Sequence, residues 1–211
     1  MRIALLLAAV AVLGIAWLGP LPDLARQSFA AHMTMHMAVV AAAAPLMAFA
    51  ASGSTVDPAR VMPRLLAPIP ASVIELVVVW AWHAPVLHHA ARHQTGALVI
   101  EQGSFLVAGL LLWIAAFGGA REQRRFRAGP GVIALLFTSM HMTLLGALFA
   151  LSNRPLFQHP MSEQGARAAL ADQHLGGAIM LLVGGASYLV GGLWLTSGML
   201  RAPIVRRELS S

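Results

Sequence analysis

The sequence predicts an all-α, polytopic membrane protein, and three observations support this. Of its 211 residues, 58% are hydrophobic and only 10% are charged, with a mean hydropathy of +0.74. A soluble domain could not cover its surface with so few charges. The apolar residues gather in runs of about the length at which a helix crosses a bilayer. Short arginine-bearing segments separate the runs, as expected for the loops of a helical bundle.

Six apolar segments are long enough, or nearly so, to cross roughly 30 Å of hydrocarbon at about 1.5 Å per residue. We expect one integral-membrane domain over residues 1–211, with spans at about 3–18, 29–51, 71–91, 95–117, 131–151 and 175–200. Pro85 should kink or loosen the end of the third span, because proline lacks an N–H group. In the one long loop, Glu163–Ala171 predicts a small helix.

The arginines set the expected orientation. All 14 basic residues are arginine, and with the N-terminus in the cytoplasm ten of them face inward and four outward. This agrees with the positive-inside rule, and the run Arg121–Arg127 contributes most to it. The first segment also resembles a signal peptide with a cleavage site at Ser28-Phe29-Ala30, although the intervening gap is long for one.

In that orientation none of the nine histidines is cytoplasmic, although only the arginines were used to fix it. Histidine is costly in hydrocarbon, so a gathering of histidines at one membrane face indicates a purpose. His32 and His36 are four residues apart and share a helix face. Met33 and Met37 repeat this spacing, and imidazole with thioether is a ligand set that suits copper.

The candidate metal ligands are therefore His32, His36, His83 and His141, with His88, His174, Met33 and Met37 as additions. His141 falls deep in the fifth span, where a polar group needs a partner. Simpler interpretations stay open for each: a histidine at headgroup level, a histidine bonded to a neighbouring helix, or a packed methionine.

Four further residues are expected to support the ligands without binding metal: Asp172, Gln173, Glu101 and Trp82. Asp172 either caps the sixth span or accepts a hydrogen bond from a ligand imidazole. Glu101 is an intramembrane carboxylate, whose expected partner is a histidine or Arg92. Glu75, by contrast, is expected at headgroup level at the inner end of the third span.

Several function classes are excluded. Without cysteine there can be no disulfide, iron–sulfur cluster or thiolate metal site. No phosphate-binding loop, Ser/His/Asp arrangement or paired carboxylates occur, so we predict no catalytic residues and no enzyme activity. The formal charge of +6 lies in loops that set topology, which gives no support for nucleic-acid binding.

Four groups of residues resemble, in their order, the CtaG-type cytochrome c oxidase assembly factors. They are His32-Met33-x-x-His36 with Pro45-Leu46, Trp82-His83-x-Pro85, Phe105-x-x-x-Gly109-x-x-x-Trp113 and Asp172-Gln173-x-x-x-Gly177. The chain departs from the family in carrying Leu98 and Gln102 where histidines are expected, and six spans where seven are common. The resemblance implies a chaperone-like factor of the bacterial plasma (inner) membrane. Such a factor would contact heme–copper oxidase subunits, within the lipid bilayer, and handle copper for them.

Three hypotheses follow. The first is an oxidase assembly factor that holds copper in the outer half of the membrane and assists its insertion. The second is an electron-transfer protein with heme b between facing histidines, such as His36 and His141 or His83 and His174. The third is a scaffold that contacts oxidase subunits through glycine-rich faces. Copper oxidation state and self-association into a homo-oligomer are left open.

Overall fold

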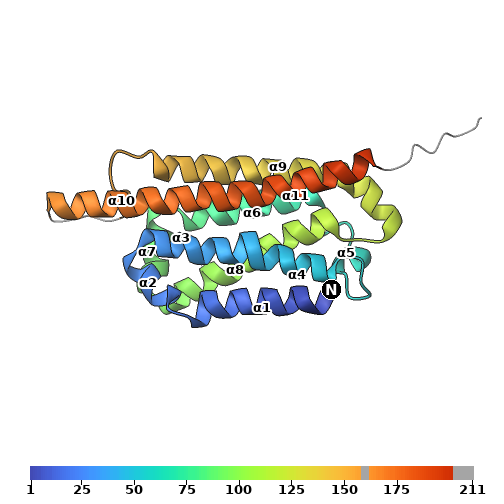
Figure 1. Ribbon diagram of the computed structural model, residues 1–211, viewed down its shortest axis with the longest axis horizontal. Helices are drawn as coiled ribbons and strands as arrows, with labels where there is room; N and C mark the ends of the chain where they lie inside the picture. Colours follow the sequence, from blue (N-terminus) through green and yellow to red (C-terminus); the bar gives the residue numbers. More distant parts are fainter. Residues whose placement is uncertain (158–161, 202–211) are drawn as a thin grey trace, which may run out of the picture.

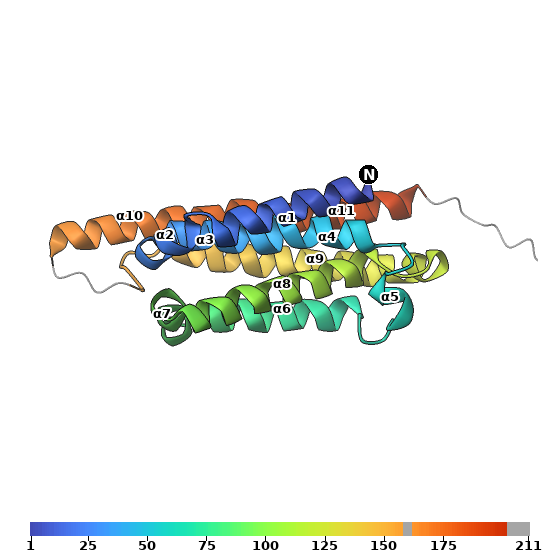
Figure 2. The ribbon, with the colours of Figure 1, turned by 90° about the horizontal axis from the view of Figure 1, so that it is seen from below.

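The computed structural model describes residues 1–157 and 162–201, and within them the chain is helical and contains no strand. It forms an elongated bundle with its helices roughly along one axis (Figures 1 and 2). The predicted all-α polytopic bundle is thus confirmed. In the part of the chain that the structure describes, four helices are long and apolar enough to cross a membrane, or up to six if each of two bent helix pairs counts as one span.

The first and third predicted spans lie in bent helix pairs, and the second is one continuous helix with a π-helical turn inside it. The first is α1 (Arg2–Leu18), followed at a 48° bend by α2 (Leu21–Gln27). The second runs through α3 (Phe29–Met37), the π-helix η1 (Ala38–Ala43) and α4 (Ala44–Ala51). After the short α5 (Pro58–Val61), the third consists of α6 (Pro68–Trp82) and α7 (Pro85–His93), bent by 72°.

The remaining spans are long helices. The fourth is α8 (Thr95–Phe117), and the fifth is α9 (Arg121–Ala150), which begins ten residues before the predicted span. The sixth runs without a break through α10 (Glu163–Ile179), the π-helix η2 (Met180–Gly184) and α11 (Gly185–Leu200). The helix expected over Glu163–Ala171 is present, but it is the first part of this span; expecting it as a separate element was wrong.

The predicted loosening at Pro85 is a complete break. Pro85 is the first residue of α7, and Ala84 before it is extended, with φ −65° and ψ 137°. A residue that precedes proline is disfavoured in the helical region, so α6 must end here. The expected kink at Pro85 is thus present, and it is larger than a loosened last turn: α7 turns away by 72° at one end of the bundle (Figure 1).

Pro45 explains the π-helix after α3. Because proline has no N–H group, the carbonyl of Ala41 lacks its usual partner in the next turn. The Ser187 hydroxyl of α11 donates to that carbonyl at 2.9 Å. The opened turn thereby ties the second span to the sixth.

The core lies between α3–η1–α4, α6, α8, α9 and α10–η2–α11. Many leucine, isoleucine and valine side chains are instead exposed on the outside of the bundle, among them Val10, Val99, Ile133 and Leu193. An apolar exterior is what lipid contact requires. The N-terminus and the start of α9 lie at one end of the bundle, and α7 and the start of α10 lie at the other (Figure 1).

Candidate functional site

A cluster of four buried histidines lies near the end of the bundle that α7 closes. Helix α3 supplies His32 and His36, His83 follows the last residue of α6, and His88 lies in α7. All four are 6% exposed or less. The histidine cluster, as we call these four residues, joins side chains that are up to 56 positions apart in the sequence.

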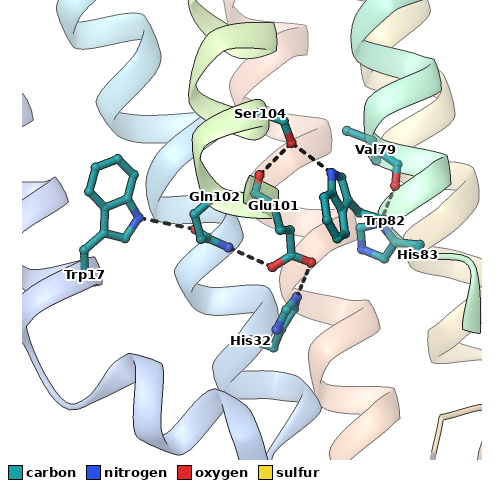
Figure 3. A network of polar contacts seen from close by, with 8 residues as sticks. All are labelled: Trp17, His32, Val79, Trp82, His83, Glu101, Gln102 and Ser104. Carbon is teal, nitrogen blue, oxygen red and sulfur yellow. Dashed lines mark hydrogen bonds and ion pairs between the residues drawn. The ribbon is translucent and has the colours of Figure 1, made fainter. Parts of the chain in front are cut away.

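The outer part of the cluster contains a carboxylate. His32 Nε2 lies 3.0 Å from Glu101 Oε1 of α8, and the His32 and His88 rings are 4.8 Å apart between centroids. His32, His88 and Glu101 each offer one potential ligand atom, a ring nitrogen or a carboxylate oxygen. These three atoms lie within 4.8 Å of one another. Figure 3 shows the contact between His32 and Glu101. Glu101, expected only to support the ligands, is thus positioned to be a ligand itself.

The inner part of the cluster pairs His36 with His83, whose ring centroids are 5.4 Å apart. His83 Nδ1 lies 2.6 Å from the carbonyl oxygen of Val79. A carbonyl only accepts, so Nδ1 carries the proton and Nε2 is left with its lone pair. Phe105 of α8 stacks on His36 with the ring centroids 3.7 Å apart and fixes the plane of that imidazole.

Most ring nitrogens of the cluster have no hydrogen-bond partner. Among the described residues, none is found for His32 Nδ1, for His83 Nε2, or for either nitrogen of His36 and His88. A buried polar atom without a partner costs about 1–3 kcal/mol, so such atoms are rare in native proteins. Six such nitrogens, from four histidines, are therefore gathered in this part of the bundle.

Polar contacts hold the carboxylate of Glu101 in place. Gln102 donates through Nε2 to Glu101 Oε2 at 3.2 Å, and Trp17 donates through Nε1 to Gln102 Oε1 at 3.4 Å. Ser104 donates to the Glu101 backbone carbonyl at 2.8 Å and accepts from Trp82 Nε1 at 2.8 Å (Figure 3). Trp82 and Gln102, from two different spans, therefore both support the segment that carries Glu101.

Asp172 supports the cluster from a distance. Its carboxylate accepts hydrogen bonds from the Ser28 hydroxyl at 2.6 Å and from the backbone N–H groups of Phe29 and Ala30 at 2.5 and 3.3 Å. It lies within α10, so it caps the helix that carries His32 instead of its own. Gln173 beside it accepts from the N–H group of Leu156 at 2.7 Å. Both expected roles for Asp172, capping the sixth span and accepting from an imidazole, are replaced by this contact.

Other predicted ligands lie outside the cluster. His141 is 3% exposed, and its ring contact among the described residues is with Phe137 of its own helix, 5.7 Å away. His174 Nε2 lies 2.8 Å from the carbonyl oxygen of Ser152. Met33 and Met37 are buried against Gly176 and Gly184 of the sixth span, respectively. His159 lies outside the described residues.

Glu75 was misplaced by the sequence analysis. It is fully buried in the bundle and bonds the hydroxyl of Tyr188, which also lies 3.4 Å from the Val40 carbonyl oxygen of η1. Helix α6 begins at Pro68, so Glu75 lies two turns into the helix and not at its edge. The signal in the sequence was a carboxylate inside an apolar run, together with the single tyrosine of the chain.

The fold and the site define a polytopic helical membrane protein with a buried histidine–carboxylate cluster towards one end. Comparison with protein families then places it: a family model described as cytochrome c oxidase caa3 assembly factor (Caa3_CtaG) matches residues 1–202. The chain belongs to this family of oxidase assembly factors, in agreement with the resemblance seen in its sequence. No curated protein and no solved structure matches it.

Proposed function

We propose that this assembly factor binds copper at the histidine cluster and assists its insertion into the oxidase on the outer side of the membrane. The observation that supports the proposal most directly is the set of unpartnered imidazole nitrogens in His32, His36, His83 and His88. Among the described residues, six of the eight ring nitrogens of these four histidines lack a hydrogen-bond partner, which a bound ion explains better than packing does.

The donor chemistry fits copper. His32, His88 and Glu101 offer two imidazoles and a carboxylate, and His36 and His83 offer two further imidazoles beside them. Imidazole is a good ligand for copper, which heads the usual affinity order of the divalent metals. Because the cysteine-free chain offers no thiolate, selection for copper would rest on this order and on the geometry of the rings.

The arrangement favours an ion over a macrocycle. Phe105 covers one face of His36 at 3.7 Å, and the neighbouring histidine rings are 4.8 and 5.4 Å apart. A cavity of about 670 Å³ does exist in the bundle, but Met1, Phe49, Trp113 and Trp194 are among its lining residues and no histidine is. These contacts favour copper over the heme b hypothesis.

The role proposed is to hold and transfer the metal, without turnover. The family supplies the destination, since its members assist the assembly of cytochrome c oxidase. Contacts with oxidase subunits and residence in the bacterial plasma membrane follow from that membership as parts of the proposal. The copper would be cargo for the oxidase, so a site of moderate affinity that can open is expected.

The test is to purify the full chain in detergent from copper-supplemented cells and measure metal content together with the visible spectrum. We expect near-stoichiometric copper and no Soret band. His88→Gln should lower the copper content, whereas the control His174→Gln should not, because His174 is bonded to Ser152 outside the cluster. Iron with a Soret band would establish the heme hypothesis instead, and absence of both metals would favour the scaffold.

A further inference from the structure

A second pair of histidines lies on the opposite, exposed face of α7. His89 and His93 are four residues apart, and their ring centroids are 4.2 Å apart with an interplanar angle of 46°. Within the described part of the chain, neither forms a hydrogen bond or an ion pair. Their ring nitrogens are therefore available to a ligand from outside the bundle.

Helix α7 separates the two sets of histidines by its amphipathic character. Its buried face carries His88, Ala91 and Arg92, and the exposed face carries His89 and His93. The Arg92 guanidinium donates to the backbone carbonyl of Arg26 at 2.9 Å, so the nearest cation in sequence is held on the buried side. The exposed pair thus begins one residue after a member of the buried cluster.

We propose that His89 and His93 form a surface metal site that binds divalent copper. Two imidazoles one helical turn apart can both bind one ion, and their present separation already brings the rings side by side. Nitrogen donors with water in the remaining positions suit Cu²⁺, which such donors bind more tightly than Ni²⁺ or Zn²⁺. With only two protein ligands, the ion stays exchangeable.

This position suggests a role for the surface site. An ion held weakly at His89 and His93 would lie on the same short helix as His88, which is buried in the histidine cluster. The surface pair would therefore raise the rate at which the histidine cluster fills. This role as an entry site rests on the function proposed above, whereas binding of Cu²⁺ to the pair does not.

The test is a Cu²⁺ titration of the purified full chain, with bound copper counted by equilibrium dialysis. The unaltered protein should show a weaker class of sites beside the tighter buried one. His89→Gln and His93→Gln should each lower the copper affinity of these weaker sites at least about tenfold. Replacing residues that only support a metal ligand already lowers metal affinity by about that factor. Both positions are exposed, so folding is not at risk, and His174→Gln is the matched control.

The outcomes separate the two proposals. A weaker class that is unchanged in both variants overturns the surface site. If the unaltered protein shows a single weak class that His93→Gln removes, the surface site stands and the buried copper site fails. When both classes are present, the histidine cluster should take up copper more slowly in His93→Gln than in the unaltered protein, and should reach the same final copper content. An unchanged rate of uptake would overturn the entry role.

Discussion

At the scale of single residues, the site is defined by the atoms that lack partners. In His83, Nδ1–H donates a hydrogen bond to the Val79 carbonyl, and Nε2 keeps a lone pair without a partner. In His36 and His88 both nitrogens are buried and unpartnered. Glu101 is the acidic residue in contact with the cluster, since its side chain lies 3.0 Å from His32 Nε2. The carboxylate should therefore matter through its charge as well as through its hydrogen bonds.

Replacing Glu101 by glutamine tests that charge. The amide has the same shape and can still bond His32, so the fold should be retained. Copper affinity should fall about 10- to 100-fold, because the site loses its negative charge and a better ligand. The measurement is a copper competition titration against a chelator, with circular dichroism to check folding. An affinity equal to that of the unaltered protein would show that Glu101 only orients His32.

At the scale of elements, the sixth span approaches α9 so closely that only glycine fits. A Cβ atom on Gly177 would lie 2.5 Å from the Ala150 nitrogen, and one on Gly146 would lie 2.7 Å from the Leu181 nitrogen. The obstacles are backbone atoms, which cannot rotate away. This contact fixes the position of α10, and with it the carboxylate of Asp172 that caps α3.

Gly177→Ala should therefore destabilise the bundle. Forcing a methyl group into this contact should cost about 1–3 kcal/mol, as overpacking does elsewhere. The matched control is Gly103→Ala in α8, where a Cβ would meet nothing within 4 Å. That change should be neutral or stabilising by up to about 1 kcal/mol, because alanine is the better helix former. Thermal unfolding in detergent compares the two, and equal shifts would contradict the close contact.

The break between α6 and α7 is also an element-scale feature with a testable role. Pro85→Ala removes the restriction on Ala84 and lets α6 continue as a helix. His88 would then rotate away from His32, while His83 would keep its bond to Val79. We expect copper content to fall as far as in His88→Gln, with little change in thermal stability. Unaltered copper binding in Pro85→Ala would show that tertiary contacts alone maintain the bend.

At the scale of the whole molecule, the bundle has two chemically different ends. The arginine-rich start of α9 and the N-terminus share one end, and the histidine-bearing α7 and the start of α10 lie towards the other (Figure 1). The positive-inside rule assigns the arginine end to the cytoplasm. The histidine cluster would then face the outer side, where the proposed transfer of copper takes place.

The absence of cysteine makes this orientation directly measurable. Gln164, in the first turn of α10, and Arg125, near the start of α9, are both exposed and suit single cysteines. The starts of these two helices lie towards opposite ends of the bundle (Figure 1). In intact cells, a membrane-impermeant maleimide should label Gln164→Cys and should label Arg125→Cys only after the membrane is permeabilised. The reverse pattern would invert the topology and would place the histidine cluster towards the cytoplasm.

Retention of copper by the whole protein should depend on pH. An imidazole binds metal only when it is neutral, and ordinary histidine has a pKa of about 6.5. Acidification supplies protons that compete with the metal, so bound copper should decrease as the pH falls through and below that region. Dialysis at a series of pH values followed by metal analysis measures this. Copper that is retained unchanged in acid would argue against histidine as the main ligand.

The sequence predicted the fold well because hydrophobic length and arginine placement are local properties of the chain. It could not predict which histidines meet, since that depends on the rotation of each helix against its neighbours. His32 and His36 share a helix face as expected, but His141 turns towards Phe137. The error at Glu75 came from a helix boundary, because moving the start of α6 to Pro68 carries this residue into the core.

The bond between Asp172 and the start of α3 also has a consequence for biosynthesis. The ribosome makes α3 more than 140 residues before Asp172, as the sequence separation of 143 between Phe29 and Asp172 shows. During that interval the first N–H groups of α3 lack the carboxylate that holds them in the finished protein. The segment that presents His32 is therefore completed only when the sixth span enters the membrane. A nascent chain that stops before α10 carries all four histidines of the cluster without the anchor for two of them.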